Sequence, residues 1–273
     1  MIRFPNAKIN LGLNIVNRRP DGYHDIETVF YPIALNDIVE IVPAKGPVST
    51  LTTSGRPVDC PVEKNLVMKA YRAMEQEFSL PPVDIYLHKN IPDGAGLGGG
   101  SSDAANAMLI INEMFSLNLS PQQLASRAAR LGADCAFFIY NTPMTATGIG
   151  DILSPTTVHL SGHSLLLIKP EVSVPTALAY SRVTPAPSET PITDILAMPV
   201  SQWKNLLKND FEPSVFAAHP SICHIKQQIY DSGALYASMS GSGSSVFGIF
   251  ENAIMAENAK SLFPHTCAYV INL

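Results

Sequence analysis

A glycine-rich segment that joins a predicted strand to a predicted helix constrains this chain more than any other feature. Its residues are Pro92, Asp93, Gly94, Ala95, Gly96, Leu97, Gly98, Gly99, Gly100, Ser101 and Ser102. Alternating apolar residues over 83–88 predict the strand, and apolar spacing over 103–115 predicts the helix. Glycine lacks a Cβ, so such a backbone can approach a ligand closely and turn its amides inward. The N-terminus of the helix, expected near Ser102, suits phosphate, and the hydroxyls of Ser101 and Ser102 suit phosphate oxygens or magnesium.

Three interpretations of this segment compete. Gly94, Gly96 and Gly99 match the GxGxxG dinucleotide fingerprint. However, residues 115–120 hold no acid for a ribose, and several predicted elements precede the segment. The separation of Gly94 and Gly99 fits a Walker P-loop, but Gly100 stands where the lysine must be. A turn without a ligand is disfavoured because so many glycines cost considerable folding entropy. Phosphate binding without a Walker lysine fits best.

Such a site needs a cation from elsewhere in the chain, and Lys8 is the candidate. Apolar and polar residues alternate over 7–15, which predicts a half-buried strand. Lys8 shares the polar face of this strand with Asn10, and Gly12 leaves room beside them. The pattern fits a solvated lysine on an amphipathic strand equally well.

Asp134 is the candidate base for phosphoryl transfer to an alcohol, a reaction that depends on positioning, charge neutralisation and a residue that orients the hydroxyl. It follows a predicted helix end at Gly132 and is flanked by small and apolar residues. A carboxylate there is costly to bury without a partner, and Lys8 is a suitable partner. The spacing alone slightly favours the alternative that Asp134 caps a short helical turn.

A second glycine-serine run, Ser240–Ser245, precedes a predicted strand at 246–250. Serine and glycine are ordinary residues of a hairpin turn, and this segment can be one. The presence of two such runs in one chain favours a shared polyphosphate site.

The composition is that of a folded protein, with 46% hydrophobic and 15% charged residues. A net charge of −5 gives no concentrated basic surface, which argues against a nucleic-acid partner. The four cysteines lack metal-site spacing and are expected to be free thiols in a reducing cytosol. No apolar run reaches membrane-spanning length, and the first residues do not resemble a signal or transit peptide. A cytoplasmic protein with no membrane partner is therefore expected.

Two domains of α+β class are expected, residues 1–155 and 156–273, because the composition changes over 142–163. Strands are predicted at 7–15, 24–31, 36–43, 83–88, 164–168, 245–250 and 268–271. Helices are predicted at 65–78, 103–115, 121–131, 192–207, 220–232 and 252–262. Ser120 and Pro121 are expected at the N-cap and first position of one of these helices.

Taken together, these segments resemble the superfamily of galactokinase, homoserine kinase, mevalonate kinase and phosphomevalonate kinase. Within it the chain is most similar to the kinases of 4-diphosphocytidyl-2-C-methyl-D-erythritol, over essentially its whole length. The segments that carry this resemblance are Ala7–Leu11, Arg19–His24, Gly96–Ala105, Leu131–Asp134 and Ser240–Ser245.

The resemblance implies an N-terminal domain like the second domain of ribosomal protein S5 and a ferredoxin-like C-terminal domain, with the active site in the cleft between them. It implies an ATP-dependent kinase of isoprenoid biosynthesis that uses Mg²⁺ and phosphorylates the 2-hydroxyl of a cytidine-diphosphate-linked polyol. No dedicated protein ligand for the metal is evident in the sequence. The expected state is a monomer or a weak homodimer.

The resemblance also assigns roles to residues. It makes Asp134 the base and Lys8 its partner, which stabilises charge on the transferring phosphoryl group. The glycine-rich segment would bind ATP, with Asn65 and Lys89 near the adenosine. The residues that would bind the substrate are Asn10, Tyr23, His24, Tyr180, Ser240 and Gly241. Tyr23 and Tyr180 would offer stacking faces to the cytosine, and His24 would bond its edge.

Three alternatives remain at this stage. The chain can be another small-alcohol kinase of the superfamily, of the homoserine or mevalonate type, in which case Tyr23 and His24 have no cytosine to bind. The formal GxGxxG match leaves an NAD-dependent oxidoreductase as a second alternative. A catalytically silent nucleotide-binding module is the third, and the presence of both Lys8 and Asp134 counts against it.

Overall fold

The computed structural model describes residues 1–273, apart from the side chain of Ser181. Its contacts divide the chain into two compact units that interleave in the sequence. Unit 1 contains Met1–Ala7, Leu35–Asp93 and Gly98–Thr142, and unit 2 contains Lys8–Ala34, Gly94–Leu97 and Pro143–Leu273. The domain boundary predicted between residues 155 and 156 stays a prediction. The two compact units do not follow that boundary, because residues 8–34 group with the C-terminal half of the chain.

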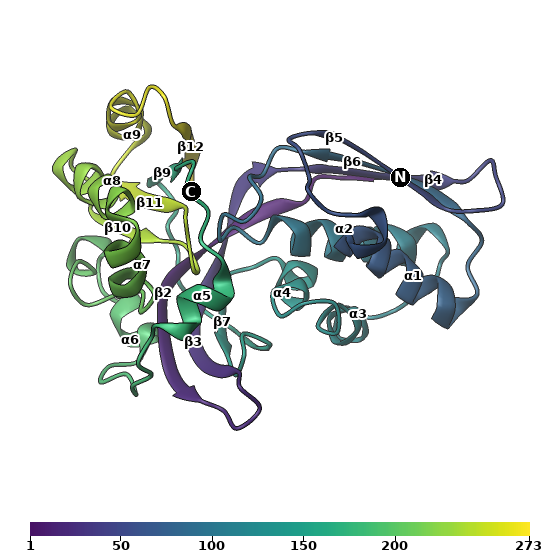
Figure 1. Cartoon of the computed structure of the whole chain (residues 1–273), viewed down its shortest axis with the longest axis horizontal. Helices are drawn as coiled ribbons and strands as arrows, with labels where there is room; N and C mark the ends of the chain where they lie inside the picture. The colour runs from purple at the N-terminus through teal and green to yellow at the C-terminus, as the bar shows by residue number, and fades with distance from the viewer. The chain divides into compact units, whose positions relative to one another are not determined.

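Unit 1 is a four-stranded sheet with helices packed on one face (Figure 1). The strand order is β1 (Ile2–Arg3), β4 (Ile38–Pro43), β6 (Val83–Lys89) and β5 (Thr50–Gly55), and only β5 and β6 are parallel. The helices are η1 (Val62–Lys64), α1 (Leu66–Phe78), α2 (Gly99–Met114), α3 (Pro121–Ala128) and α4 (Cys135–Tyr140). The predicted alternation in β6 is confirmed, since Val83, Ile85 and Leu87 are all buried.

Two helix starts in unit 1 follow from capping chemistry. Asn65 caps α1 by accepting a hydrogen bond from the amide of Val67 at 2.9 Å. Ser120 and Gln123 form a capping box at α3, which confirms the predicted start of that helix. The helix ends at Ala128, three residues before the predicted end, where the chain turns.

Unit 2 contains most of a long hairpin sheet and all of a second antiparallel sheet. The first has the order β2 (Asn6–Arg18), β3 (His24–Asn36), β7 (Met144–Thr147) and β8 (Ile152–Pro155). The second has the order β10 (Tyr236–Met239), β11 (Val246–Phe250), β9 (Ser164–Lys169) and β12 (Cys267–Asn272). The predicted turn at 20–22 joins β2 to β3.

The helices of unit 2 are α5 (Thr176–Ser181), α6 (Ile192–Leu196), η2 (Val200–Gln202), α7 (Glu212–Ala218), α8 (Pro220–Asp231) and α9 (Ala253–Lys260). Helices α8 and α9 pack against the second sheet, and a core that includes Ile168, Ile222 and Phe250 lies between them. This arrangement agrees with a ferredoxin-like layer, and the predicted α+β class is confirmed.

Some elements differ from the prediction. The helix predicted at 192–207 is wrong, because Pro199 cannot continue it and two short helices flank that residue. The structure also contains short elements that were not predicted, since each is short or lacks a clear apolar period. They are strands β1, β5, β7, β8 and β10 and helices α4, α5 and α7. Within the described residues, no helix combines the length and apolar character needed to cross a bilayer.

Candidate active site

The glycine-rich segment forms the connection between β6 and α2, and its glycines serve a conformational need. Gly94, Gly96 and Gly98 have φ of 57°, 74° and 71°, the left-handed region that side chains with a Cβ rarely adopt. At Gly96 there is a second reason, because a Cβ would collide with the carbonyl oxygen of Ser240. Every second residue over 94–98 therefore has a left-handed backbone, and each of these positions is a glycine.

Three consecutive carbonyl groups of this connection are held by unit 2. The amide of Ser245 donates to the Ala95 oxygen at 3.3 Å, the Ser240 hydroxyl to the Gly96 oxygen at 2.8 Å, and the Lys8 amide to the Leu97 oxygen at 3.0 Å. A trans peptide directs its N–H opposite to its carbonyl. The amides of the next residues, 96 to 98, therefore point away from these partners, in the manner of a backbone site for anions.

The second glycine-serine run is both a hairpin turn and a neighbour of the first. It joins β10 to β11, and the Ser240 amide donates to the Ser245 oxygen at 2.9 Å. Its bonds to Ala95 and Gly96 bring the two runs together within unit 2. The hairpin interpretation and the interpretation of two adjacent runs are thus compatible.

In unit 1, helix α2 begins at Gly99, four residues before the predicted range of 103–115, so the last glycines of the segment form its first turn. Gly98 stands at the N-cap without a side chain to bond the first amides, which leaves a positive helix end. The hydroxyl of Ser102 is fully buried there and has no hydrogen-bond partner among the described residues. Leu66, at the start of α1, lies 3.7 Å from the Cβ position of Gly100, so the two helix N-termini are adjacent.

Lys8 is buried, with 4% of its surface exposed, so the interpretation as a solvated lysine is wrong. Its Nζ donates to Oδ1 of Asn10 at 2.6 Å and lies 4.8 Å from the ring centroid of Phe30. Asn10, which is also buried, donates in turn to the Thr28 hydroxyl at 3.0 Å. Residues 7–13 of β2 are all buried, so the prediction that this strand is half-buried is wrong.

Asp134 occupies the position before the first residue of α4, but its side chain makes no capping hydrogen bond. The alternative role as a helix cap is therefore not supported. The carboxylate is half-buried, and the apolar helix that follows, Cys135–Tyr140, is almost wholly buried. Asp134 belongs to unit 1 and Lys8 to unit 2, so their pairing stays a prediction.

Two of the predicted substrate residues form an aromatic pair within unit 2. The rings of His24 and Tyr180 stack with centroids 5.0 Å apart and planes at 21°. Tyr180 also meets Phe211 edge-on at 4.8 Å. Tyr23 is 62% exposed, and its amide is bonded to Asp21 in the turn.

The segment that precedes Tyr180 runs beside both glycine-rich runs. The hydroxyls of Thr176 and Ser242 are hydrogen-bonded at 3.1 Å, and the Ser244 hydroxyl donates to the Val172 carbonyl. Ser173 Oγ lies 3.6 Å from the Cβ position of Gly94. Unit 2 therefore gathers Lys8, the middle of the first run and the second run in one region, next to the segment that carries the aromatic pair.

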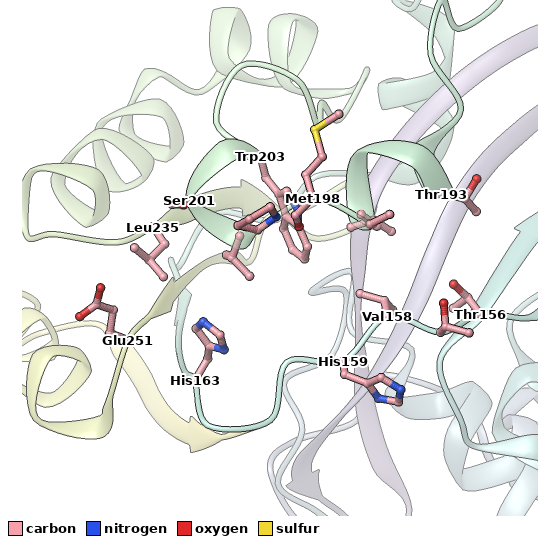
Figure 2. A pocket seen from close by; sticks show the side chains of 15 residues that line it. Thr156, Val158, His159, His163, Thr193, Met198, Ser201, Trp203, Leu235 and Glu251 are labelled. Atoms are coloured by element: carbon pink, nitrogen blue, oxygen red, sulfur yellow. The ribbon is translucent and has the colours of Figure 1, made fainter.

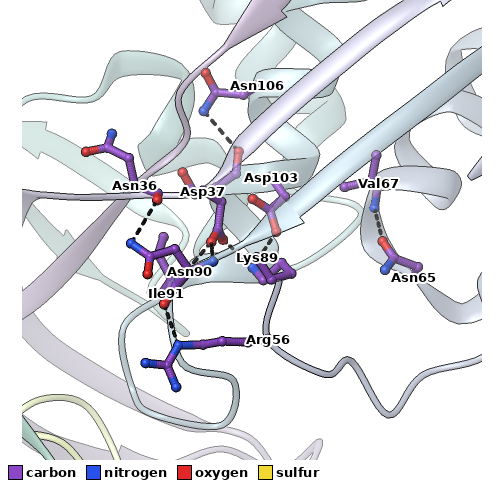
Figure 3. Close-up of polar contacts among 11 residues, drawn as sticks. Asn36, Asp37, Arg56, Asn65, Val67, Lys89, Asn90, Ile91, Asp103 and Asn106 are labelled. Atoms are coloured by element: carbon purple, nitrogen blue, oxygen red, sulfur yellow. Dashed lines mark hydrogen bonds and ion pairs between the residues drawn. The ribbon is translucent and has the colours of Figure 1, made fainter. Parts of the chain in front are cut away.

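Lys89 is buried in unit 1 between two carboxylates (Figure 3). Its ammonium forms ion pairs with Asp37 and, at 2.7 Å, with Asp103 of α2. Oδ1 of Asp37 accepts from the amides of Asn90 and Ile91 at 2.5 and 2.7 Å. The cluster thus connects the strand end that precedes the glycine-rich segment with the helix that follows it. The predicted contact of Lys89 with adenosine stays a prediction, but this ammonium already binds two carboxylates.

The ionisation of this cluster follows from its burial. Burial raises the pKa of Asp103 to about 7, with the ammonium of Lys89 opposing the rise and the like charge of Asp37 adding to it. Burial alone would lower the pKa of Lys89, but the two carboxylates outweigh it and the net direction is upward. Sequence analysis missed Asp37 and Asp103, although an acidic residue in the first turns of an otherwise apolar helix was an available signal.

Two further missed residues support the second run. Nδ2 of Asn209 donates to the carbonyls of Met239 and Gly241 at 2.8 and 2.9 Å. Oε1 of Glu212 accepts from the Met239 amide at 2.9 Å, while Oε2 pairs with Lys226 at 2.6 Å. No pattern in the sequence distinguishes these two residues from other polar residues of that region.

A separate pocket of about 720 Å³ lies elsewhere in unit 2. Figure 2 shows Trp203, His163 and Glu251 around it. Its lining includes none of the site residues described above. Within the described residues there is also no cluster of three or more His, Cys, Asp or Glu side chains that could hold a metal ion.

We expect the replacement Gly96→Ala to distort the connection, because a Cβ at φ 74° would collide with the Ser240 carbonyl. The melting temperature should fall, and the affinity for MgATP should fall by roughly tenfold or more, measured by calorimetry. Gly46→Ala is the matched control, since a Cβ there meets no atom within 4 Å. Unchanged MgATP affinity in Gly96→Ala would contradict this account.

The raised pKa of Asp103 predicts a pH dependence of stability. Because the folded pKa of about 7 exceeds the ordinary value of 3.8, the folded state binds more protons than the unfolded state between these values. The contribution of Asp103 to the free energy of unfolding is therefore complete below pH 3.8 and is lost as the pH rises through 7. Asp103→Asn should remove on the order of 2 kcal/mol of the decline in unfolding free energy between pH 5 and 8.

Urea denaturation of the wild type and of Asp103→Asn at both pH values measures this difference. Asp59→Asn, at an exposed carboxylate, is the control. Equal pH slopes for the wild type and Asp103→Asn would show that Asp103 does not titrate in this range.

Comparison with known proteins agrees with this geometry. Residues 65–142 match the GHMP kinases N terminal domain, and residues 194–265 match the GHMP kinases C terminal family. The chain is 55% identical over 252 residues to 4-diphosphocytidyl-2-C-methyl-D-erythritol kinase of Bacteroides fragilis, and 54% identical over 251 residues to the kinase of the same name from Parabacteroides distasonis. Each alignment covers 92% of both chains.

Solved structures of kinases are also similar to this chain. A crystal structure of 4-(cytidine 5'-diphospho)-2C-methyl-D-erythritol kinase superposes with a TM-score of 0.84 at 31% identity, over 99% of this chain and 98% of that one. A mevalonate kinase structure matches with a TM-score of 0.77 at 12% identity, over 100% of this chain and 98% of that one, which shows the shared fold alone. These matches favour the kinase interpretation over the dinucleotide-binding alternative. The chain belongs to the 4-diphosphocytidyl-2-C-methyl-D-erythritol kinase family of the GHMP kinases.

Proposed function

We propose that this chain transfers the γ-phosphate of MgATP to the 2-hydroxyl of 4-diphosphocytidyl-2-C-methyl-D-erythritol, giving the 2-phosphate and ADP. One observation carries the proposal. Within unit 2, the strand of Lys8, the middle of the glycine-rich segment and the 240–245 run are joined by hydrogen bonds. A lysine and two glycine-rich backbones are thereby assembled in one region, as transfer between a polyphosphate and an alcohol requires.

The triphosphate would bind the segment Pro92–Ser102. Three features support this placement. The amides of residues 96–98 point away from the partners that hold the preceding carbonyls, the N-terminus of α2 is positive, and the hydroxyl of Ser102 has no hydrogen-bond partner among the described residues. Asn65 would contact the adenosine through Nδ2, because its Oδ1 caps α1. For Lys89 we favour a structural role, in which it joins the two ends of the glycine-rich segment, over a direct contact with adenosine. Its ammonium binds Asp37 and Asp103.

Magnesium would arrive with ATP as part of the substrate. The phosphate oxygens would provide most of its ligands, with a serine hydroxyl of Ser101 or Ser102 as a further one.

The chemical step needs a group that receives the hydroxyl proton and a charge that stabilises the phosphoryl oxygens. We assign the first role to Asp134 and the second to Lys8. The substrate oxygen attacks the γ-phosphorus, its proton passes to the carboxylate of Asp134, and the bond to ADP breaks. Asn10, beside Lys8, would contact the diphosphate or polyol of the substrate.

The cytosine would bind at the aromatic pair, with Tyr23 as an additional exposed face. Rings that flank a base lie about 7 Å apart, twice the van der Waals contact distance of about 3.5 Å. His24 and Tyr180 are 5.0 Å apart, which leaves no room for a base between them. We therefore propose that the cytosine replaces the His24 ring on Tyr180 and that His24 turns to bond the edge of the base. Ser240 and Gly241 would contact the diphosphate.

The test of the reaction is ADP formation by purified protein with MgATP and each of four alcohols: 4-diphosphocytidyl-2-C-methyl-D-erythritol, homoserine, mevalonate and galactose. ADP should form with the cytidylyl compound only. Asp134→Asn should lower kcat by roughly 100-fold or more while MgATP binding persists. ADP with another alcohol instead would overturn the substrate assignment, and unchanged kcat in folded Asp134→Asn would remove the proposed base.

Substitution of Tyr180 tests the base site. Tyr180→Ala should raise KM for the cytidylyl substrate by roughly 5- to 100-fold, the cost of one lost base stack, with a smaller effect on kcat. Tyr180→Phe keeps the ring and the contact with Phe211 and should leave KM within a few-fold of the wild type. If Tyr180→Ala and Tyr180→Phe gave the same KM as the wild type, the cytosine would have to bind elsewhere.

The cytoplasmic location and the monomeric or weakly dimeric state remain predictions from the sequence.

A further inference from the structure

Behind Lys8, a chain of three hydrogen bonds connects side chains of β2 and β3 within unit 2. Nζ of Lys8 donates to Oδ1 of Asn10 at 2.6 Å, and Nδ2 of Asn10 donates to Oγ1 of Thr28 at 3.0 Å. Oγ1 of Thr28 donates to the carbonyl of Gly12 at 2.5 Å. The side chains of Lys8, Asn10 and Thr28 are 4%, 2% and 0% exposed, so water does not compete for these bonds.

The direction of every bond in this chain is fixed by chemistry. An ammonium group only donates, so the oxygen of the Asn10 amide must face Lys8 and its NH₂ group must face Thr28. The Thr28 hydroxyl must accept that bond, and its single hydrogen therefore goes to the Gly12 carbonyl. A rotation of the Asn10 amide by 180° would place two donors opposite each other at Lys8. The Gly12 carbonyl can only accept, so it takes the hydrogen of the Thr28 hydroxyl and leaves that hydroxyl as an acceptor for the Asn10 amide. Lys8 at one end and Thr28 at the other therefore favour the same orientation of the amide.

The backbone supports this arrangement from both strands. Gly12 has φ of 68° in the interior of β2, a left-handed residue of the kind that interrupts the regular ladder at a bulge. Thr28 is held in β3 opposite Ala146 of β7. Phe30, two residues further on the same face of β3, places its ring 4.8 Å from Nζ of Lys8. One strand face therefore contacts the ammonium with Phe30 and orients its amide acceptor with Thr28.

We propose that Thr28 is a positioning residue for phosphoryl transfer, which fixes the amide of Asn10 and through it the Lys8 ammonium. The inference rests on the proposed function, in which Lys8 stabilises charge in the transition state. Thr28 itself is fully buried, which leaves no surface for a contact with the substrate. Its loss would remove one of the two hydrogen bonds that hold the Asn10 amide, so the oxygen that accepts from the ammonium would be free to move. A small displacement of a catalytic charge lowers kcat more than it weakens substrate binding.

Thr28→Val removes the hydroxyl and keeps the shape of the side chain, and Thr28→Ser keeps the hydroxyl. We expect kcat to fall roughly 10- to 100-fold in Thr28→Val, with KM for MgATP within about threefold of the wild type. Thr28→Ser should retain kcat within about threefold. If Thr28→Val is not folded, Thr28→Ser against Thr28→Ala gives the same comparison, because those two differ in the hydroxyl alone. Wild-type kcat in folded Thr28→Val or Thr28→Ala would overturn the proposal.

A double-mutant cycle separates positioning from a general structural role. If Thr28 acts through Asn10, then Thr28→Val should lower kcat in the wild type and have no further effect in the Asn10→Ala background. The same loss of kcat in both backgrounds would contradict the proposal. The assay uses whichever alcohol the wild type phosphorylates. Failure of the cytidylyl substrate with the wild type would therefore count against the proposed function, and a missing coupling would count against the role of Thr28.

Discussion

The site depends on the backbone between β6 and α2, whose carbonyl groups are held by three partners. Ala95, Gly96 and Leu97 accept hydrogen bonds from the second glycine-serine run and from the strand of Lys8. Because each peptide is planar and trans, fixing the carbonyls also fixes the direction of the following amides. The left-handed glycines permit this geometry, and the partners select it. A phosphate site made of main-chain amides is then available without a Walker lysine.

Local features of this site could be predicted from the sequence because they have local causes. The glycine-rich segment, the presence of a strand at β2 and the cap at Ser120 were all evident in short stretches of chain. The burial of Lys8 could not be predicted in this way. Alternation shows that Lys8 and Asn10 share one face of a strand, but only distant partners decide whether water covers that face. The start of α2 was placed too late because glycine has a low helix propensity, which tertiary packing overrode.

The residues that sequence analysis missed share a physical character. Asp37 meets Lys89 across 52 positions of chain, and Asn209 meets Met239 across 30. Each is a polar residue whose partner is remote, so no periodicity or turn signal marks it. The same holds for Thr28. In the sequence it is an ordinary strand residue, and only the folded structure shows that its hydroxyl donates to the Gly12 carbonyl. Long-range pairing of buried polar groups is a property of the folded state.

The two buried lysines show how partners decide the role of the same side chain. Lys89 lies between two carboxylates, which together more than neutralise its charge, so it can bind the ends of the glycine-rich segment together but offers little field to a ligand. Lys8 donates to a neutral amide, a bond that orients the ammonium and leaves its charge unchanged. Stabilisation of a phosphoryl group needs a charge that is both held in place and electrostatically effective. The amide of Asn10, held by Thr28, contributes to the first condition and adds no opposing charge of its own.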